Sequence, residues 1–424
     1  MKRFLLSILI ISASISCQRG VQSFELGPGY AETSVNAVKF RGSSITSDSK
    51  VQLASYYDPD GKVILAKRNL GDSHWNILET NLDGECKDAH NSISIAIDGK
   101  GYVHISWSQH SSPLNYAIST EPYGAEFRRQ FELINTKEET DVTYPEFHRF
   151  TDGTLLFAYR QGISGNGNLV LNRYFPEDRS WERVQSRLLD GEGQRNAYWQ
   201  MYVDPQDNIH LSWVWRETWD VYTNHDICYA VSHDQGSSWQ DIDGNEYRLP
   251  INLASAKKAC EIPMGSELIN QTSMTADSQG HPTIASYWTA QGDSIPQFRI
   301  VHHDGSSWSV STVSDRKTAF SLSGGGTKAI PVSRPQIVDR NGEFILLFRD
   351  EERGSKVSAA RMENSGWKIT DLSEESVGSW EPSIDYERIK HDGILDIFVQ
   401  KVLQGDGEKT VSSPATPVRI LELK

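Results

Sequence analysis

Hydrophobic and polar residues alternate along most of the chain, in pairs of short segments joined by a turn that usually begins at an aspartate. Alternation with a period of two residues is typical of β-strands that bury one face. The clearest pairs cover 90–107, 144–160 and 198–215, and weaker copies begin at Asn270, Arg334 and Glu381. After residue 16, no long stretch has the spacing of an amphipathic helix. The pattern predicts an all-β protein built from repeated hairpins.

A second repeated marker lies between the hairpins. Residues 232–239, Ser-His-Asp-Gln-Gly-Ser-Ser-Trp, fit the Asp-box pattern Ser-x-Asp-x-Gly-x-Ser/Thr-Trp, and degenerate copies end at Trp75, Trp181, Trp308 and Trp367. Six hairpin units and the strand-rich segment 35–82 make seven units of about 56 residues, the size of a four-stranded propeller blade. We predict a single seven-bladed β-propeller over 35–424. Its final strand, 418–423, is expected to close the ring against the first blade.

The N-terminal residues have the pattern of an export signal. A positively charged start precedes the apolar run 4–11, which is too short to cross a bilayer. Ser14-Ile15-Ser16-Cys17 resembles a bacterial lipoprotein cleavage site. We expect residues 1–16 to be a signal peptide, Cys17 to carry a lipid at the cell envelope, and 17–34 to be a linker. Plain secretion is the alternative.

The charge of the protein narrows the class of its partners. The 424-residue chain has 42 Lys and Arg against 56 Asp and Glu, a net charge of −14 at pH 7. This balance argues against a nucleic-acid partner, because such proteins carry a basic surplus. An anionic ligand is still compatible, since a local basic face can lie on an acidic body. We expect a monomer that contacts the membrane only through its lipid.

The repeat pattern also predicts where functional residues gather. In a propeller blade the start of the innermost strand and the end of the second strand reach the same face. The first strands begin at His90, Tyr144, Tyr198, Asn270, Arg334 and Glu381, and the second strands end at His110, Arg160, Arg216, Trp288, Arg349 and Lys401. Singly, each has a structural explanation, such as a strand cap or a solvated charge. Together they form a cationic and aromatic patch that indicates a carboxylate or sulfate ligand.

Several segments carry a resemblance to a known family. They are 88–98, 144–147 with 157–165, and 211–218 with 224–226. These segments resemble the BNR-repeat family, which contains the propeller-type ulvan lyases of polysaccharide lyase families 24, 25 and 40. The match is good over about 85–240 and loose elsewhere. The resemblance implies that His90, His110, Tyr144, Arg160 and Tyr198 line the cleft, the first four with catalytic roles. We expect Tyr198 to contact flanking sugars or sulfates together with three residues of the repeat map, Arg216, Asn270 and Arg334.

The reaction that the resemblance implies is β-elimination at a uronic acid, without a cofactor. The proton on C5 becomes acidic only when the adjacent carboxylate is neutralised, and the planar guanidinium of Arg160 suits this task with help from a histidine. Tyr144 is the expected base, and also a candidate acid for the leaving oxygen. A tyrosine base needs nearby cations that lower its pKa.

Two other functions and one metal site stay open at this level. A sialidase-like hydrolase would use a tyrosine beside an acid such as Glu146 or Glu381, and a glycan-binding lipoprotein would need no catalysis. His225, Cys228, His233 and Cys260 have the donor types of a tetrahedral structural zinc, although their spacing matches no standard motif. The alternative for these four is buried cysteines and surface histidines.

Overall fold

The computed structural model describes residues 20–38, 40, 43–134, 139–270, 273–364 and 366–424. The expected signal peptide 1–16 and the lipidation site Cys17 lie outside these residues. Within the described ranges, no helix is long and apolar enough to span a membrane.

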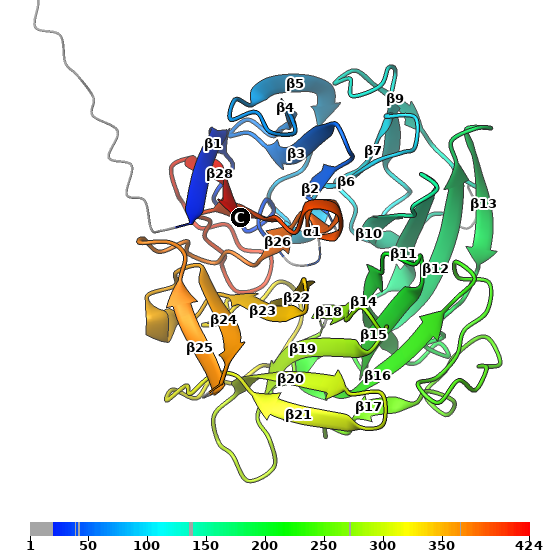
Figure 1. Cartoon of the computed structure of the whole chain (residues 1–424), viewed down its shortest axis with the longest axis vertical. Helices are drawn as coiled ribbons and strands as arrows, with labels where there is room; N and C mark the ends of the chain where they lie inside the picture. Colours follow the sequence, from blue (N-terminus) through cyan, green and yellow to red (C-terminus); the bar gives the residue numbers. More distant parts are fainter. Residues whose placement is uncertain (1–19, 39, 41–42, 135–138, 271–272, 365) are drawn as a thin grey trace, which may run out of the picture.

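Seven antiparallel sheets of four strands surround a central axis, as predicted (Figure 1). Blade 1 contains β2 (Ile45–Ser47), β3 (Val51–Tyr57), β4 (Lys62–Asn69) and β5 (Asn76–Asp83). Blade 2 contains β6 (Ser94–Ile97), β7 (Val103–Ser106), β8 (Tyr116–Ser119) and β9 (Phe127–Gln130). Blade 3 contains β10 (Val142–Arg149), β11 (Leu155–Ile163), β12 (Asn166–Phe175) and β13 (Ser180–Gln185). Blade 4 contains β14 (Asn196–Val203), β15 (Ile209–Arg216), β16 (Asn224–Ser232) and β17 (Lys258–Cys260).

The remaining blades follow the same order, from the axis outward. Blade 5 contains β18 (Ser273–Ala276), β19 (Pro282–Trp288), β20 (Gln297–His303) and β21 (Trp308–Thr312). Blade 6 contains β22 (Gln336–Arg340), β23 (Glu343–Phe348), β24 (Ser358–Glu363) and β25 (Gly366–Asp371). Blade 7 contains β26 (Ser383–Ile384), β27 (Leu395–Gln400), β28 (Thr416–Leu423) and β1 (Val21–Gly29). The short helices are η1 (Ala89–Asn91), η2 (Val221–Thr223), η3 (Glu351–Arg353) and α1 (Tyr386–Asp392).

The ring closes differently from the prediction. The last strand, β28, does not pair with the first blade but with the N-terminal strand β1, from Val21↔Leu423 to Gly29↔Thr416. Residues 21–29, expected to lie in a linker, are therefore the outermost strand of blade 7. Both ends of the chain thus complete one sheet, which leaves neither terminal strand with an unpaired inner edge.

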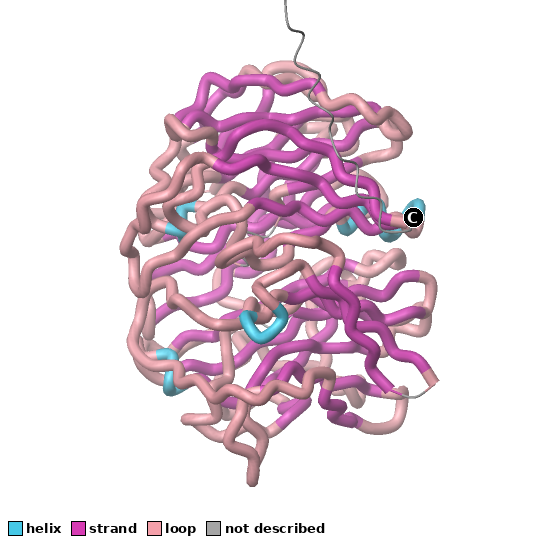
Figure 2. Tube along the Cα trace, turned by 90° about the vertical axis from the view of Figure 1, so that its left-hand side faces the viewer, coloured by secondary structure: helices cyan, strands magenta, loops and turns pink. Residues whose placement is uncertain are grey.

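Aspartate turns shape the hairpins on one face of the ring. Asp98 accepts hydrogen bonds from the backbone N–H groups of Lys100 and Tyr102 (2.9 and 2.8 Å). Asp204 and Asp277 make the same pair of bonds in blades 4 and 5. These side chains fold the chain back after each inner strand. Figure 2 shows the strands crossing the thickness of the disc, with loops on both faces.

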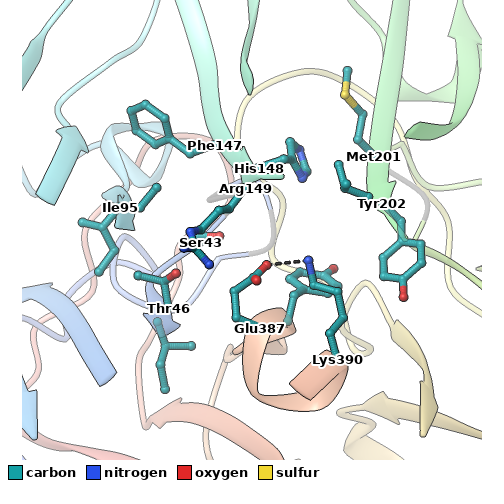
Figure 3. A pocket seen from close by; sticks show the side chains of 14 residues that line it. Ser43, Thr46, Ile95, Phe147, His148, Arg149, Met201, Tyr202, Glu387 and Lys390 are labelled. Carbon is teal, nitrogen blue, oxygen red and sulfur yellow. Dashed lines mark ion pairs between the residues drawn. The ribbon is translucent and has the colours of Figure 1, made fainter. Parts of the chain in front are cut away.

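Side chains fill the central channel. α1 directly follows β26 and lies at the end of the channel where the inner strands end. Asp385 caps this helix by accepting hydrogen bonds from the Glu387 and Arg388 N–H groups. Figure 3 shows the cavity that this helix borders, with an ion pair between Glu387 and Lys390 (2.5 Å). Its volume is about 30 Å³.

A buried polar network joins the closing blades. Arg68 of blade 1 donates to Glu422 of β28 (2.7 Å) and to Gln52 (2.8 Å). The Gln52 amide in turn donates to Asp385 and Asp396 of blade 7 (both 2.8 Å). Arg68 is 2% exposed, so its charge depends on these partners. The network ties the first blade to the last across the seam where the ring closes.

Replacing Arg68 by Met tests this seam. The side chain keeps its volume but removes a buried cation that Glu422 and Asp396 share with Arg388, and it leaves Gln52 Oε1 without its donor. We therefore expect a loss of about 1–3 kcal/mol of unfolding free energy. Arg419→Met is the matched control, because Arg419 pairs with Glu25 in the same blade on the exposed surface (3.3 Å). Such a surface pair contributes about 0–1 kcal/mol. Equal losses in chemical denaturation would contradict the role assigned to Arg68.

Candidate active site

Two histidines from blade 2 share one carboxylate. Nδ1 of His90 lies 2.9 Å from Oδ1 of Asp88, and Nδ1 of His110 lies 2.5 Å from Oδ2 of the same side chain. The two imidazole rings stack at 4.0 Å between centroids with an angle of 16°. The predicted histidine pair is therefore assembled, and Asp88, which was not among the predicted site residues, orients both rings.

The local sequence fixes this arrangement on both sides. Asp88 is the N-cap of η1 and accepts a hydrogen bond from the His90 N–H (2.9 Å). The ring of Phe40 stacks on His90 at 4.6 Å. Buried Gln109 donates to the carbonyls of Ser112 and Val142 (2.9 and 3.2 Å) and so holds the loop that carries His110. Both imidazoles are positioned before any ligand arrives.

The charges around the pair favour an imidazolium at His90. Burial works against a charged ring there, but hydrogen bonds to Asp88 and Glu408 outweigh it and raise the pKa of His90. Glu408 comes from the loop before β28 and lies 3.3 Å from Nδ1. Burial also works against the charge of Asp88, yet its bonds to His110 and His90 hold its pKa well below the usual range. The carboxylates thus favour the charged form of His90, and the two histidines favour the charged form of Asp88.

Tyr144 lies at a β-bulge in β10. The β10–β11 register shifts between Thr143 and Glu146, and Tyr144 has a φ of +57°. A bulky residue in this left-handed region is strained, and a bulge turns a side chain out of its regular direction. The turned ring lies 5.8 Å from the His90 ring and 6.0 Å from the Tyr198 ring. The bulge therefore places Tyr144 between the histidine pair and the next blade.

Arg160 is a buried cation without a carboxylate. Its guanidinium donates to the Thr143 hydroxyl (2.9 Å), the Gly162 carbonyl (3.1 Å) and the Ser111 hydroxyl (3.3 Å). It lies over the Tyr144 ring at 5.0 Å and is 2% exposed. No acidic side chain of the described residues is within ion-pair distance of it. Since buried charges are normally paired, this one is prepared for an anion that the chain does not supply.

Arg216 forms a second site of the same kind around Tyr198. Its guanidinium donates to the Tyr198 hydroxyl (3.3 Å) and to the carbonyls of Trp219 and Gly324. The Tyr198 hydroxyl also lies 3.3 Å from the Ser164 hydroxyl and 3.4 Å from the Asn196 amide. In the part of the chain that the structure describes, Arg216 has no acidic partner either. Among the hydrogen-bond partners of Arg216, the Tyr198 oxygen is the one that can become an anion.

The two tyrosines have opposite pKa shifts. Burial opposes ionisation of Tyr198, but Arg216 and then Arg160 overcome it and lower its pKa to about 7. Burial raises the pKa of Tyr144, and so does the negative charge of Tyr198, although Arg160 and Arg216 act in the other direction. Such neighbours titrate as a pair rather than singly. The sequence predicted the lowered pKa at Tyr144, whereas the structure gives it to Tyr198.

The remaining predicted contact residues lie deeper in the ring. Arg334 donates to both carboxylate oxygens of Glu381 (3.0 and 3.1 Å) and to the Asn270 carbonyl (3.1 Å). Arg334, Glu381 and Asn270 are all buried. Arg334 is thus already neutralised, and its charge reaches the site mainly as one of the cations near Tyr144. The structure therefore gives Arg334 a partner within the chain, unlike Arg160 and Arg216.

The four residues considered for zinc do not form one ligand cluster. His225 uses its ring nitrogens toward Asp226 and Glu217 (both 3.0 Å), and His233 turns Nδ1 to Asn208 (2.7 Å). Cys228 is buried in β16, and burial raises the pKa of its thiol, which disfavours the thiolate that zinc needs. Among the described residues, the one group with three possible metal-ligating side chains close together is Asp88, His90 and His110. In this group the Nδ1 atoms of both histidines are hydrogen-bonded to Asp88.

Comparison with known proteins bears on the identity of the chain. A family model described as BNR repeat-containing family member matches residues 51–316. An ulvan lyase of Alteromonas sp. (strain LOR) is 20% identical over 270 residues, 55% of this chain and 56% of that protein. A protein of Pseudoalteromonas sp. (strain PLSV) named Ulvan Lyase-PL25 is 22% identical over 233 residues, 48% of this chain and 47% of that protein. The chain thus aligns with about half the length of these curated relatives.

Solved structures share the fold over nearly the whole chain. The polysaccharide lyase Uly1 superposes with a TM-score of 0.67 at 15% identity, over 98% of this chain and 94% of that one. A PL25 ulvan lyase superposes with a TM-score of 0.65 at 16% identity, over 91% and 94%, and has also been solved bound to -[GlcA(1-4)Rha3S]-. Since the family model covers more than half of the sequence and the fold agrees, this chain belongs to the BNR repeat-containing family.

Proposed function

We propose that the protein is a polysaccharide lyase that cleaves a uronate-containing, sulfated polysaccharide of the ulvan type by β-elimination. One observation carries the proposal: two buried arginines without carboxylate partners flank a pair of tyrosines, beside an imidazolium held by Asp88. A uronate supplies the missing carboxylate, and elimination needs the cation, the base and the acid that this group contains. The named relatives support the substrate class.

Arg160 is the group we assign to the uronate carboxylate. Its fork is held by Thr143 and Gly162, so it binds without losing much freedom. His110 is its partner in this role, because it is 32% exposed and its stacking on His90 places it at the open side of the site. Pairing the carboxylate with the Arg160 cation stabilises the carbanion that forms at C5.

The tyrosine pair is the group we assign to proton transfer. Tyr144 is 8% exposed and Tyr198 2%, so the substrate reaches Tyr144 first. Because Tyr198 carries the negative charge near neutral pH, Tyr144 becomes the base when its own proton passes to Tyr198. In the resting enzyme the negative charge thus lies on Tyr198 beside Arg216, and Tyr144 is the base that takes the proton from C5.

The elimination balances with these groups alone. Tyr144 takes the proton from C5, and the electron pair of that bond forms the C4=C5 double bond. The C4–O bond breaks with its electrons on the oxygen, which recovers a proton from the same tyrosine. The products are a chain with an unsaturated uronate and a chain with a new hydroxyl. Activity rises with pH as the pair ionises near 7, and falls again as His90 loses its proton.

The hydrolase alternative fits the contacts less well. Its acid candidates are already engaged, since Glu381 is held by Arg334 and Glu146 accepts a hydrogen bond from the Trp199 indole (2.8 Å). Incubation of the protein with ulvan separates the functions. A lyase generates the ultraviolet absorbance of a conjugated unsaturated uronate, whereas a hydrolase releases reducing ends without it. A binding protein changes neither signal, and either of these results would refute the proposal.

Phenylalanine variants separate the roles of the two tyrosines. Tyr144→Phe removes the group at C5, so we expect kcat to fall by about a hundredfold or more. Tyr198→Phe removes the hydroxyl that ionises near pH 7, so the acidic limb of the pH–rate profile should move to higher pH while measurable activity remains. The control is Tyr202→Phe, which removes a hydroxyl from the channel side of the same strand, β14. If Tyr198→Phe is inactive and Tyr144→Phe is not, Tyr198 is itself the base.

A further inference from the structure

Trp219 is an unusual tryptophan in this protein. Of the 12 tryptophans, the other 11 are buried or half-buried, whereas Trp219 is 62% exposed. It follows β15 by three residues, and its carbonyl accepts a hydrogen bond from Arg216, the cation beside Tyr198. Removing a large apolar ring from water is favourable, and exposed aromatic rings commonly mark contact surfaces.

The loop between β21 of blade 5 and β22 of blade 6 supports one face of the indole. Gly324 donates its N–H to Asp220 (2.7 Å) and accepts at its carbonyl from the Val221 N–H (2.9 Å). A Cβ atom at Gly325 would lie 3.0 Å from Cε3 of Trp219, so the ring rests directly on backbone. The three consecutive glycines 324–326 leave no side chain under the ring. One face of the indole is therefore held while the rest stays open.

The same loop connects this ring to the other end of the site. Three residues beyond Gly324, Thr327 donates its N–H to Glu408 (2.8 Å), and its hydroxyl lies 3.5 Å from Nδ1 of His90. The loop 324–327 thus runs from the Arg216 side to the His90 side. Trp219 and the histidine pair are at opposite ends of the row of residues that we assign to the uronate.

We propose that the exposed face of Trp219 is a stacking platform for the sugar next to the uronate, a ring that presents C–H groups such as a deoxyhexose. This inference rests on the proposed function. An aromatic face attracts the apolar face of a sugar and not its charged edge, so Trp219 suits the neighbour and the arginines suit the uronate. The platform would select polymers in which a uronate alternates with a sugar that has an apolar C–H face, including a sulfated deoxyhexose.

Three variants test the platform. Trp219→Ala removes the ring, and we expect KM for ulvan to rise about tenfold with kcat within about twofold of the wild type. Trp219→Phe keeps an aromatic face and should recover much of this loss. Phe131→Ala is the control, because Phe131 is 76% exposed but follows the outermost strand of blade 2. It should leave KM unchanged. A shared melting temperature would show that the fold survives.

Fluorescence quenching reads the platform without relying on turnover. Since Trp219 is the exposed tryptophan, iodide quenches it preferentially, and bound ulvan should protect it in the wild type and in Phe131→Ala. If ulvan protects Trp219 from iodide but no unsaturated product forms, the platform stands and the lyase proposal fails. If product forms while Trp219→Ala has a normal KM or ulvan gives no protection, the lyase stands and the platform is refuted. Absence of both product and protection refutes both.

Discussion

Closure of the ring is the constraint on which the rest of the structure depends. β1 and β28 complete one sheet, and Arg68 joins that sheet to the first blade through Glu422. Once the circle is closed, the inner strands of the blades converge on a narrow axis. Polar residues at their ends are then buried together, although they are tens of residues apart in the sequence, and each needs a partner in a place with little water.

Most of these buried charges find their partners within the chain. Arg334 is held by Glu381, and Arg68 is held by Glu422. Arg160 and Arg216 have hydroxyls and carbonyls instead of carboxylates. Their uncompensated charge is what lowers the pKa of Tyr198 and what a uronate would neutralise. The same unpaired positive charge therefore stabilises the tyrosinate and forms the binding site for the uronate carboxylate.

The sequence predicted the architecture because repeats and alternation are local signals. It could not predict that 21–29 joins blade 7, since an outer strand that faces solvent alternates weakly and its partner lies at the other end of the chain. The repeat map brought together His90, His110, Tyr144, Arg160 and Tyr198, and the structure confirms that they are neighbours.

What the sequence missed depends on pairing in space. Arg334 and Glu381 both occupied predicted site positions, and only the structure shows that they neutralise each other. Asp88 stood in the recognised segment, and its place two residues before His90 is an N-cap signal that could have been used. Glu408 could not have been found, because it reaches His90 from the last loop of the chain.

The central claim is that unpaired buried arginines keep one tyrosine ionised near neutral pH. Tyrosinate absorbance followed against pH, in the ligand-free protein, measures this directly. With 16 tyrosines in the chain, one should ionise with a midpoint near 7, well before the others, and this step should disappear in Tyr198→Phe. If no tyrosine ionises until the pH reaches the ordinary range near 10, the arginines do not create a base and the account is contradicted.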